Sequence, residues 1–358
     1  MTEQPQSTTV PVPPQATREV DCVIVGGGAA GLSAAVNLGR MRRRVLVVDD
    51  KDRFRWRHRI RNYLGFPDGI PAGELRRIGR RQALLYGVNL VIGVVTSAGP
   101  EGDGFRLRID ATRPYPGVDP EAWAKGADAD LVGTSEVVEA GRPLDVRART
   151  VILATGVGGH FPDFPGRDEC VGISLFWCIH CDGFESSNKV VGVVGHDEEA
   201  VETALDLLDF TPRVSLVAGR AEGFSVADAR LADVEAAGIP AYACAVAEYV
   251  NSDGRISTLA LDDPDRTHIA VEHVYTVQHS RPWNAVGLQL GVDVNDIGHV
   301  LVDTDQHTSV DGVLAAGDLT SPHDHQFSAA VHEGNQAACA ANYILYRPEQ
   351  RAPGESNC

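Results

Sequence analysis

Short apolar runs alternate with glycine-rich turns and amphipathic stretches along most of this chain of 358 residues. Residues 21–25 (DCVIV) have the length and β-branched content of a buried strand, and residues 32–40 follow with the polar and apolar spacing of a helix. A second apolar run lies at 44–48. A strand, a helix and another strand in this order are typical of a parallel βαβ unit, so the pattern predicts an α/β fold.

The turn between the first predicted strand and helix has the GxGxxG spacing of a dinucleotide-binding site. Gly26 permits the tight turn, Gly28 lets a pyrophosphate approach the backbone, and Gly31 lets helix and strand pack closely. Asp49 ends the next strand, at the position where an acid binds a ribose hydroxyl. The residues of this predicted site are Gly26, Gly28, Ala29, Ala30, Gly31 and Asp49.

Cys178 and Cys181 are separated by two residues and are followed at once by Asp182 and Gly183. This spacing can close a small disulfide ring, and a helix that begins there would lower a thiol pKa through its unpaired N–H groups. Asp182 would then donate a proton to a departing thiolate. A CxxC pair is also half of a zinc site. The other cysteines form no second CxxC and no CxxH, so their spacing disfavours structural zinc. They are Cys22, Cys170, Cys244, Cys339 and Cys358.

Two more apolar strands run into a glycine further along the chain, at 150–156 and 311–318. Together with the first glycine-rich turn they resemble the three FAD-contacting segments of the flavoprotein disulfide reductases. With the CxxC pair added, the chain from about Val20 to Tyr346 is similar to the low-molecular-weight thioredoxin reductase family, because four motifs occur in that family's order. The resemblance implies FAD as cofactor and two doubly wound, three-layer dinucleotide-binding-type domains, the second inserted in the first.

The resemblance also implies a role for each member of the thiol pair. Cys181 would lie beside the flavin and exchange electrons with it, while Cys178 would react with the disulfide of a thioredoxin-like protein. Asp182 would act as the acid and base. Asn62 matches the family's flavin-side asparagine, and Gln326 begins a helix whose positive N-terminus would stabilise the reduced flavin. The other implied FAD contacts are Thr155, Gly156, Gly317, Asp318 and Phe327.

The motif positions divide the chain into an FAD-binding domain in two parts, 19–158 and 284–346, and an NAD(P)-binding-like domain at 159–283 that carries the CxxC couple. Residues 1–18 and 347–358 have the composition of tails, the first of them disordered. The stretch from 113 to 143 is longer than a simple strand connection, and we interpret it as a surface insertion. We also expect a homodimer.

The second glycine-rich turn, where the family binds NADPH, is altered in this chain. In residues 195–200 (GHDEEA) the first glycine remains, but Asp197 occupies the place where the backbone must approach a pyrophosphate. Three consecutive carboxylates would repel that group by about 1 to 4 kcal/mol at separations of about 4 Å. At the end of the next strand only Arg220 remains of the residues that bind a 2′-phosphate. We therefore expect NADPH binding to be weakened or lost. In the alternative, the loop still admits NADH or NADPH in a relaxed pose.

Positive charge is concentrated in one part of an acidic chain. Residues 40–81 hold 14 Lys and Arg against 5 acids, whereas the whole chain has a formal net charge of −17. From Arg53 to Arg61 arginines alternate with mostly apolar residues, so an extended backbone would place them on one side. This face is either a solvated surface with a few arginines on FAD phosphates, or a dock for an acidic electron carrier such as ferredoxin. Nucleic acid is disfavoured because the overall field is negative.

Two histidines flank an acid at 323–325, directly before the helix that is expected to begin at Gln326. A metal site usually needs a third or fourth protein ligand, so we expect no metal here. His325 replaces the arginine that the family often carries before its glutamine. A histidine that titrates near neutral pH beside flavin and dithiol would serve as the base for an incoming thiol, unless it is only a polar loop residue.

Composition favours a cytoplasmic enzyme with no membrane partner. No apolar run approaches the roughly 20 residues that span a bilayer, and residues 1–18 lack the hydrophobic centre of a signal peptide. The odd number of cysteines indicates thiols that are mostly reduced in a cytosol.

Two functions remain open. The first is a disulfide reductase that serves a thioredoxin-like protein, with NAD(P)H or an acidic carrier as electron donor. The second is a dithiol oxidase that closes a disulfide in a small dithiol or a protein, with oxygen as acceptor. A purely binding role would leave Cys178, Cys181 and Asp182 without a purpose.

Overall fold

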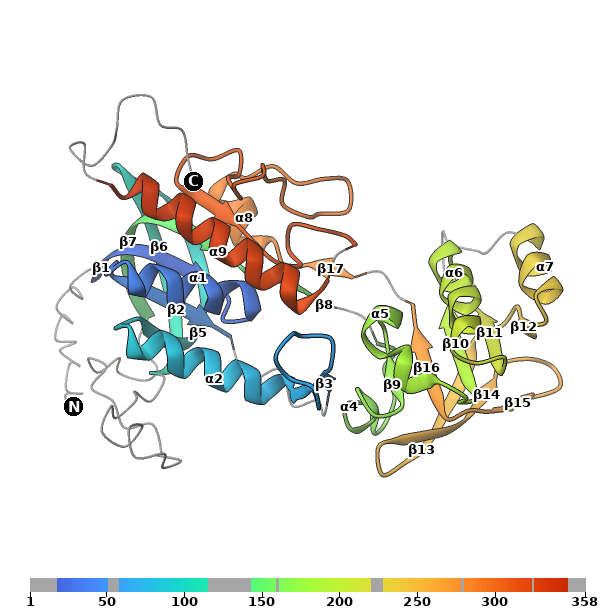
Figure 1. The fold of residues 1–358 in the computed structure, drawn as a ribbon. Coiled ribbons are helices and arrows are strands. Elements are labelled where there is room, and N and C mark those ends of the chain that lie inside the picture. The colour runs from blue at the N-terminus through green and yellow to red at the C-terminus, as the bar shows by residue number, and fades with distance from the viewer. Residues whose placement is uncertain are drawn as a thin grey trace, which may run out of the picture.

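The computed structural model describes residues 18–50, 58–114, 143–158, 161–219, 228–277, 280–323 and 325–346. The described residues form two α/β units, each with its own main sheet and helices (Figure 1). The predicted α/β fold class is confirmed.

The first sheet has six strands in the order β1-β2-β5-β6-β7-β18. The strands are β1 (Arg18–Val25), β2 (Val45–Asp49), β5 (Asn89–Glu101), β6 (Gly104–Pro114), β7 (Pro143–Leu153) and β18 (Val313–Ala315). Strand β1 is parallel to both β2 and β7, and β18 is parallel to β7. Strand β6 is antiparallel to β5 and to β7. The carboxyl ends of β1, β2, β7 and β18 therefore meet at one edge, where ligands bind in such sheets.

Both faces of the first sheet are buried, which explains why the β1 run is apolar at nearly every position. Val23 and Val25 belong to one core cluster, whereas Cys22 and Ile24 belong to the cluster on the other face. The helices of this unit are α1 (Ala29–Arg40), α2 (Ala72–Leu85), α8 (Ala285–Leu290) and α9 (Phe327–Ile344). Helices α1 and α9 lie side by side (Figure 1). Two short strands, β3 (Arg59–Ile60) and β4 (Ile70–Pro71), pair with each other beside α2.

The second main sheet has five parallel strands in the order β12-β11-β10-β16-β9. They are β9 (Leu175–Phe176), β10 (Val191–Gly195), β11 (Val214–Ala218), β12 (Ala241–Tyr242) and β16 (His273–Thr276). An antiparallel sheet of β13 (Val246–Ser252), β14 (Arg255–Leu261) and β15 (His268–Ala270) belongs to the same unit. Its helical segments are α4 (Arg167–Cys170), α5 (Ile179–Asp182), η1 (Phe184–Ser186), α6 (Glu198–Asp206), η2 (Leu207–Asp209) and α7 (Asp228–Ala236).

The chain passes from one unit to the other and back along two short strands that pair with each other, β8 (Val157–Gly158) and β17 (Arg281–Pro282). The ring of Trp283 packs on this crossing, because a Cβ atom at Gly158 would lie 2.4 Å from its Cζ2 atom. The domain boundaries expected at 158 and 284 lie beside this pair, and their assignment stays a prediction.

Several element ends differ from the sequence prediction. Strand β1 begins at Arg18, which was expected in the tail, because its pairing with β7 extends to Val146. Helix α1 begins at Ala29, three residues early, with Gly28 as its N-cap. Most of the expected insertion at 113–143, together with residues 1–17 and 347–358, lies outside the described residues. Within the described part of the chain, no helix is both long and apolar enough to cross a membrane.

The close packing of α1 against α9 leads to a stability prediction for Gly334. A Cβ atom there would lie 2.1 Å from the carbonyl oxygen of Ala30, so the two helices would have to separate. We expect Gly334→Ala to lower the stability by about 1 to 3 kcal/mol, although alanine ordinarily favours a helix over glycine. The matched control is Gly99→Ala, since no atom lies within 4 Å of an added Cβ there. Thermal unfolding should show a lower midpoint for Gly334→Ala alone, and equal midpoints for the two variants would contradict the packing argument.

Candidate functional site

A large cavity of about 1370 Å³ follows the carboxyl edge of the first sheet and reaches the CxxC segment. Most of the predicted cofactor residues line it. These are Gly26, Gly28, Ala29, Ala30, Asp49, Asn62, Thr155, Gly156, Gly317, Asp318, Gln326 and Phe327. The predicted catalytic residues Cys181 and His325 line it as well, whereas Cys178, Asp182 and Gly31 do not. The structure thus brings together segments that are up to about 300 residues apart in the sequence.

The glycine-rich turn has the shape that a bound dinucleotide requires. Gly26 has a φ of +108°, and a Cβ atom there would meet the carbonyl oxygen of Ala154 at 2.1 Å. A Cβ atom at Gly31 would lie 1.9 Å from the carbonyl oxygen of Gly26, so this glycine serves helix–strand packing. Gly28 differs, because no protein atom lies within 4 Å of an added Cβ and the residue faces the cavity. The start of α1, which has no side-chain cap, can therefore bind the pyrophosphate of FAD.

Asp49 is held at the end of β2 by two arginines of α2. Its Oδ2 atom accepts hydrogen bonds from Arg76 at 2.5 Å and from Arg80 at 2.6 Å. Arg76 also donates to the carbonyl oxygen of Gly27 at 2.9 Å. Sequence reasoning did not single out Arg76, although it lies in the basic stretch 40–81. The carboxylate expected to bind a ribose hydroxyl is thus oriented by residues of the neighbouring helix.

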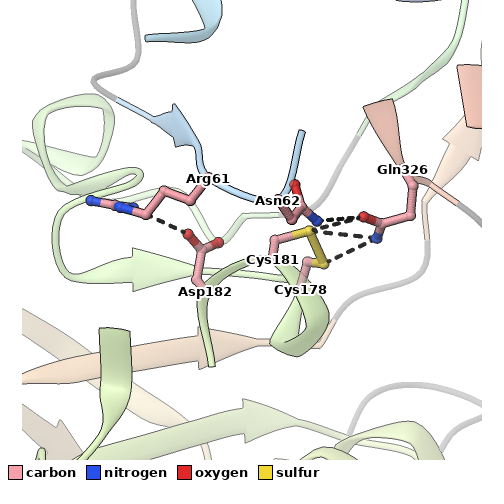
Figure 2. Close-up of a disulfide and its surroundings, with 6 residues drawn as sticks. All are labelled: Arg61, Asn62, Cys178, Cys181, Asp182 and Gln326. Carbon is pink, nitrogen blue, oxygen red and sulfur yellow. Dashed lines mark hydrogen bonds and ion pairs between the residues drawn. A yellow bond between two sulfur atoms is a disulfide. The ribbon is translucent and has the colours of Figure 1, made fainter. Parts of the chain in front are cut away.

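The two sulfur atoms form a disulfide at the start of α5, where Cys178 is the N-cap (Figure 2). Gln326, the N-cap of α9, lies opposite them, with its Nε2 atom 3.6 Å from each sulfur. The Oε1 atom of Gln326 accepts a hydrogen bond of 2.8 Å from Asn62. Because Cys181 faces the cavity and Cys178 does not, the two sulfurs have different surroundings. Gln326 therefore contacts the disulfide in addition to lining the predicted flavin site.

Asp182 follows Cys181 at the end of α5 and is fully buried, with its carboxyl group directed toward Arg61 (Figure 2). Neither of its carboxyl oxygens has a hydrogen-bond partner among the residues that the structure describes. Burial, together with the nearby charge of Glu185, raises the pKa of Asp182 to about 7, although Arg61 opposes the rise. A carboxyl group with this pKa carries a proton for much of the time at neutral pH, which an acid catalyst for thiol exchange requires.

His325, in the loop before α9, lies near the ring of His299. The Nε2 atom of His325 lies 2.8 Å from the carbonyl oxygen of Ser321, and its ring centroid lies 6.2 Å from that of His299. Burial lowers the pKa of His299, and the charge of His325 adds to this effect. The Nδ1 atom of His299 is in turn 3.2 Å from the carbonyl oxygen of Asp318. In the described ranges, no three His, Cys, Asp or Glu side chains gather as metal ligands do.

Of the alternating arginines between Arg53 and Arg61, the two that the structure describes contact other groups of the chain. Arg59 donates hydrogen bonds to the carbonyl oxygens of Asp68 and Gly69, at 3.2 and 2.7 Å. The Nε atom of Arg61 lies 3.2 Å from Glu185 in the second unit. Residues 51–57, with Arg53, Arg55 and Arg57, lie outside the described residues.

The second glycine-rich turn leads into helix α6, whose first turn is capped by the side chain of Asp197. The carboxylate of Asp197 accepts a hydrogen bond of 3.2 Å from the backbone N–H of Ala200 at the start of α6. The next residue, Glu198, pairs with Arg230 at 2.7 Å. The partial positive charge and unpaired N–H groups at this helix N-terminus already interact with a carboxylate of the chain. They are therefore not available to a pyrophosphate. Arg220 lies outside the described residues.

Comparison with known proteins gives one family and several similar chains. A family model described as "Pyridine nucleotide-disulphide oxidoreductase" matches residues 20–337. The thioredoxin reductase of Treponema pallidum is 27% identical over 336 residues, which cover 91% of this chain and 97% of the relative. An alkyl hydroperoxide reductase protein of Staphylococcus aureus is 26% identical over 91% of this chain, which spans 59% of that relative's length.

Two solved structures are similar over most of the chain. The crystal structure of HlmI has a TM-score of 0.74 at 28% identity, with 91% of this chain and 92% of HlmI covered. Thioredoxin reductase from Streptococcus pyogenes has a TM-score of 0.75 over 92% of this chain and 99% of its own. At 22% identity the second likeness shows the fold alone.

The open space at Gly28 leads to a prediction for cofactor binding. We expect Gly28→Asp to fold normally but to lose FAD on purification, because the added carboxylate would occupy the approach of the pyrophosphate. Gly99→Asp is the matched control, since it adds the same charge at an open position of β5 outside the cavity. The measurement is the ratio of flavin absorbance to protein. Stoichiometric FAD in the Gly28→Asp protein would show that the site is wrongly assigned.

Proposed function

This chain belongs to the pyridine nucleotide-disulphide oxidoreductase family, and on that premise we propose that it passes electrons between FAD, the Cys178–Cys181 couple and the disulfide of a thioredoxin-like protein. It is a flavin-dependent disulfide oxidoreductase, and FAD, when bound, supplies or accepts the electron pair. The observation that carries the proposal is the position of the disulfide, with Cys181 at the wall of the predicted FAD cavity and Gln326 beside both sulfurs.

The two cysteines then have separate tasks. In the reducing direction, the Cys178 thiolate attacks the partner's disulfide, forms a mixed disulfide and displaces one partner thiolate. Asp182 donates its proton to that leaving sulfur. Cys181 next attacks Cys178, which restores the intramolecular disulfide and releases the second partner thiol. The Cys181 thiol loses its proton as it attacks, and this proton goes to the second partner sulfur, so that two electrons and two protons pass to the partner. The amide of Gln326, oriented by Asn62, donates toward the sulfurs and so stabilises the thiolate forms.

We propose that the electron donor is one other than NADPH. The capped start of α6 supports a donor other than NADPH. The excess positive charge of residues 40–81 favours an acidic carrier such as ferredoxin, although the described Arg59 and Arg61 contact groups within the chain. We further propose a homodimer in the cytoplasm. The name of the Treponema pallidum relative supports thioredoxin as the class of partner.

The same capped helix also favours a second candidate function, a dithiol oxidase. If no nicotinamide cofactor supplies electrons, an incoming dithiol can supply them, with oxygen as the final acceptor. His325, at the cavity wall, is then the base that takes the proton of the incoming thiol. To separate the two functions, the protein is reduced anaerobically and mixed with either oxidised thioredoxin or oxygen. Formation of thiols on thioredoxin supports the reductase. Rapid oxygen uptake in the presence of dithiothreitol, with no reduction of thioredoxin, supports the oxidase.

The unequal surroundings of the sulfurs predict unequal spectra for two serine variants. We expect Cys178→Ser to leave Cys181 as a thiolate against the flavin and to show a long-wavelength absorption band. In Cys181→Ser the remaining thiol is that of Cys178, which does not line the cavity, so this variant should lack the band. The absorption spectra of the two purified proteins, measured from pH 6 to 9, check the assignment. Equal spectra would show that the roles of the cysteines are not divided as proposed.

The capped start of α6 predicts that NADPH reduces this flavin slowly compared with a dithiol or a reduced carrier. Each lost charge-assisted contact weakens binding by about 1.5 to 3 kcal/mol, so the loss amounts to orders of magnitude. Restoring the family pattern with His196→Gly, Asp197→Gly, Ala218→His and Gly219→Arg should recover part of the NADPH reactivity. Stopped-flow absorbance measures the rate. Fast reduction of the unaltered protein that saturates at micromolar NADPH would refute the prediction.

A further inference from the structure

An arginine of the first unit lies between two acids of the second unit. Arg61 follows β3, and its Nε atom lies 3.2 Å from the Oε1 atom of Glu185 in η1. Its Nη1 atom lies 3.9 Å from the Oδ1 atom of Asp182 at the end of α5 (Figure 2). The side chains of Arg61 and Glu185 are 35% and 25% exposed, whereas that of Asp182 is fully buried. One guanidinium is therefore shared unequally, and the closer contact is to Glu185.

Three polar side chains beside Asp182, those of Ser186, His273 and Tyr275, form a hydrogen-bonded chain and are uncharged at neutral pH. Tyr275 on β16 is buried, and burial raises the pKa of its hydroxyl well above the usual range. That hydroxyl lies 2.9 Å from the Oγ atom of Ser186, which is also 2.9 Å from the Nδ1 atom of His273. Burial lowers the pKa of His273 to about 4, so its ring is uncharged. Ser186 also donates to Asp182, at 3.4 Å, but to its backbone oxygen and not to its carboxyl group.

The charges that act on the Asp182 carboxyl among the described residues are thus those of Arg61 and Glu185, and they have opposite signs. A positive charge favours the ionised carboxylate, and a negative charge favours the protonated acid. Glu185 has two effects in the same direction, since it repels the Asp182 carboxylate directly and also holds the guanidinium on its own side.

We propose that Arg61 and Glu185 are positioning residues that control, with opposite effects, the fraction of Asp182 that is protonated and so able to donate a proton in thiol–disulfide exchange. Arg61 reaches Asp182 from the first unit, so its attraction is present only while the two units are in contact at β3. Glu185 belongs to the same unit as Asp182 and lies three residues further along the chain. Its repulsion of Asp182 therefore does not depend on contact between the two units. The basic strip that the sequence singles out thereby supplies a residue that acts on the proton donor.

This inference rests on the proposed role of Asp182, and its test separates the two. The titration of Asp182 is followed in the oxidised, FAD-bound protein by the infrared band of the protonated carboxyl, which is assigned by its absence in Asp182→Asn. Arg61→Gln should move the midpoint up by about one pH unit, and Glu185→Gln should move it down by about one pH unit. Arg61→Lys keeps the positive charge and should leave the midpoint near that of the unaltered protein.

The matched control is Arg77→Gln, which removes an arginine from an exposed ion pair with Glu74 at 2.7 Å and should leave the Asp182 band unchanged. Shifts of opposite sign in Arg61→Gln and Glu185→Gln support the inference. An unmoved midpoint in either variant, or shifts of the same sign, overturns it. The pH dependence of exchange with a small disulfide is measured on the same proteins. If the infrared midpoints move as expected and the exchange rate does not follow, the acid role of Asp182 fails while the control by Arg61 and Glu185 stands.

Discussion

The close approach of backbones around α1 is the constraint on which the site depends. A Cβ atom at Gly31 would lie 1.9 Å from the oxygen of Gly26, and one at Gly334 would lie 2.1 Å from the oxygen of Ala30. Helix α1 is thus pressed against the turn after β1 on one side and against α9 on the other. Because α9 is placed in this way, its N-cap Gln326 reaches the disulfide of the second unit. A backbone contact between two helices therefore places the glutamine that meets the redox couple.

Two aspartates show how the same side chain has opposite consequences in different surroundings. Asp182 is buried without a hydrogen bond from any described residue, so the neutral acid is favoured and its pKa rises to about 7. Asp197 caps the start of α6, where its oxygen accepts a backbone N–H and meets the positive end of the helix. The first carboxyl can act as a proton donor. The second occupies the helix end that a dinucleotide phosphate would use.

The glycine-rich turn and the buried strands are the parts of the site that local sequence patterns predict well. The spacing of Gly26, Gly28 and Gly31 indicates backbone positions where a side chain cannot fit or would block a ligand, and such constraints act between near neighbours. The contacts of Asp49 with Arg76 and Arg80 were missed, because an arginine in a basic stretch carries no sign of which acid it binds. Trp283, which lines the cavity beside the crossing strands, has no sequence signal of its own.

The sequence by itself determined the α/β class, the first strand–helix–strand unit, and the presence of a thiol pair followed by an acid. These properties follow from periodicity, glycine spacing and residue chemistry within a few positions along the chain. Only the tertiary structure decided that Gln326 faces both sulfurs and that Arg61 lies between Asp182 and Glu185. Burial and charge at a site depend on which distant segments pack together. The sequence of one segment does not indicate which distant segment it contacts in the folded chain.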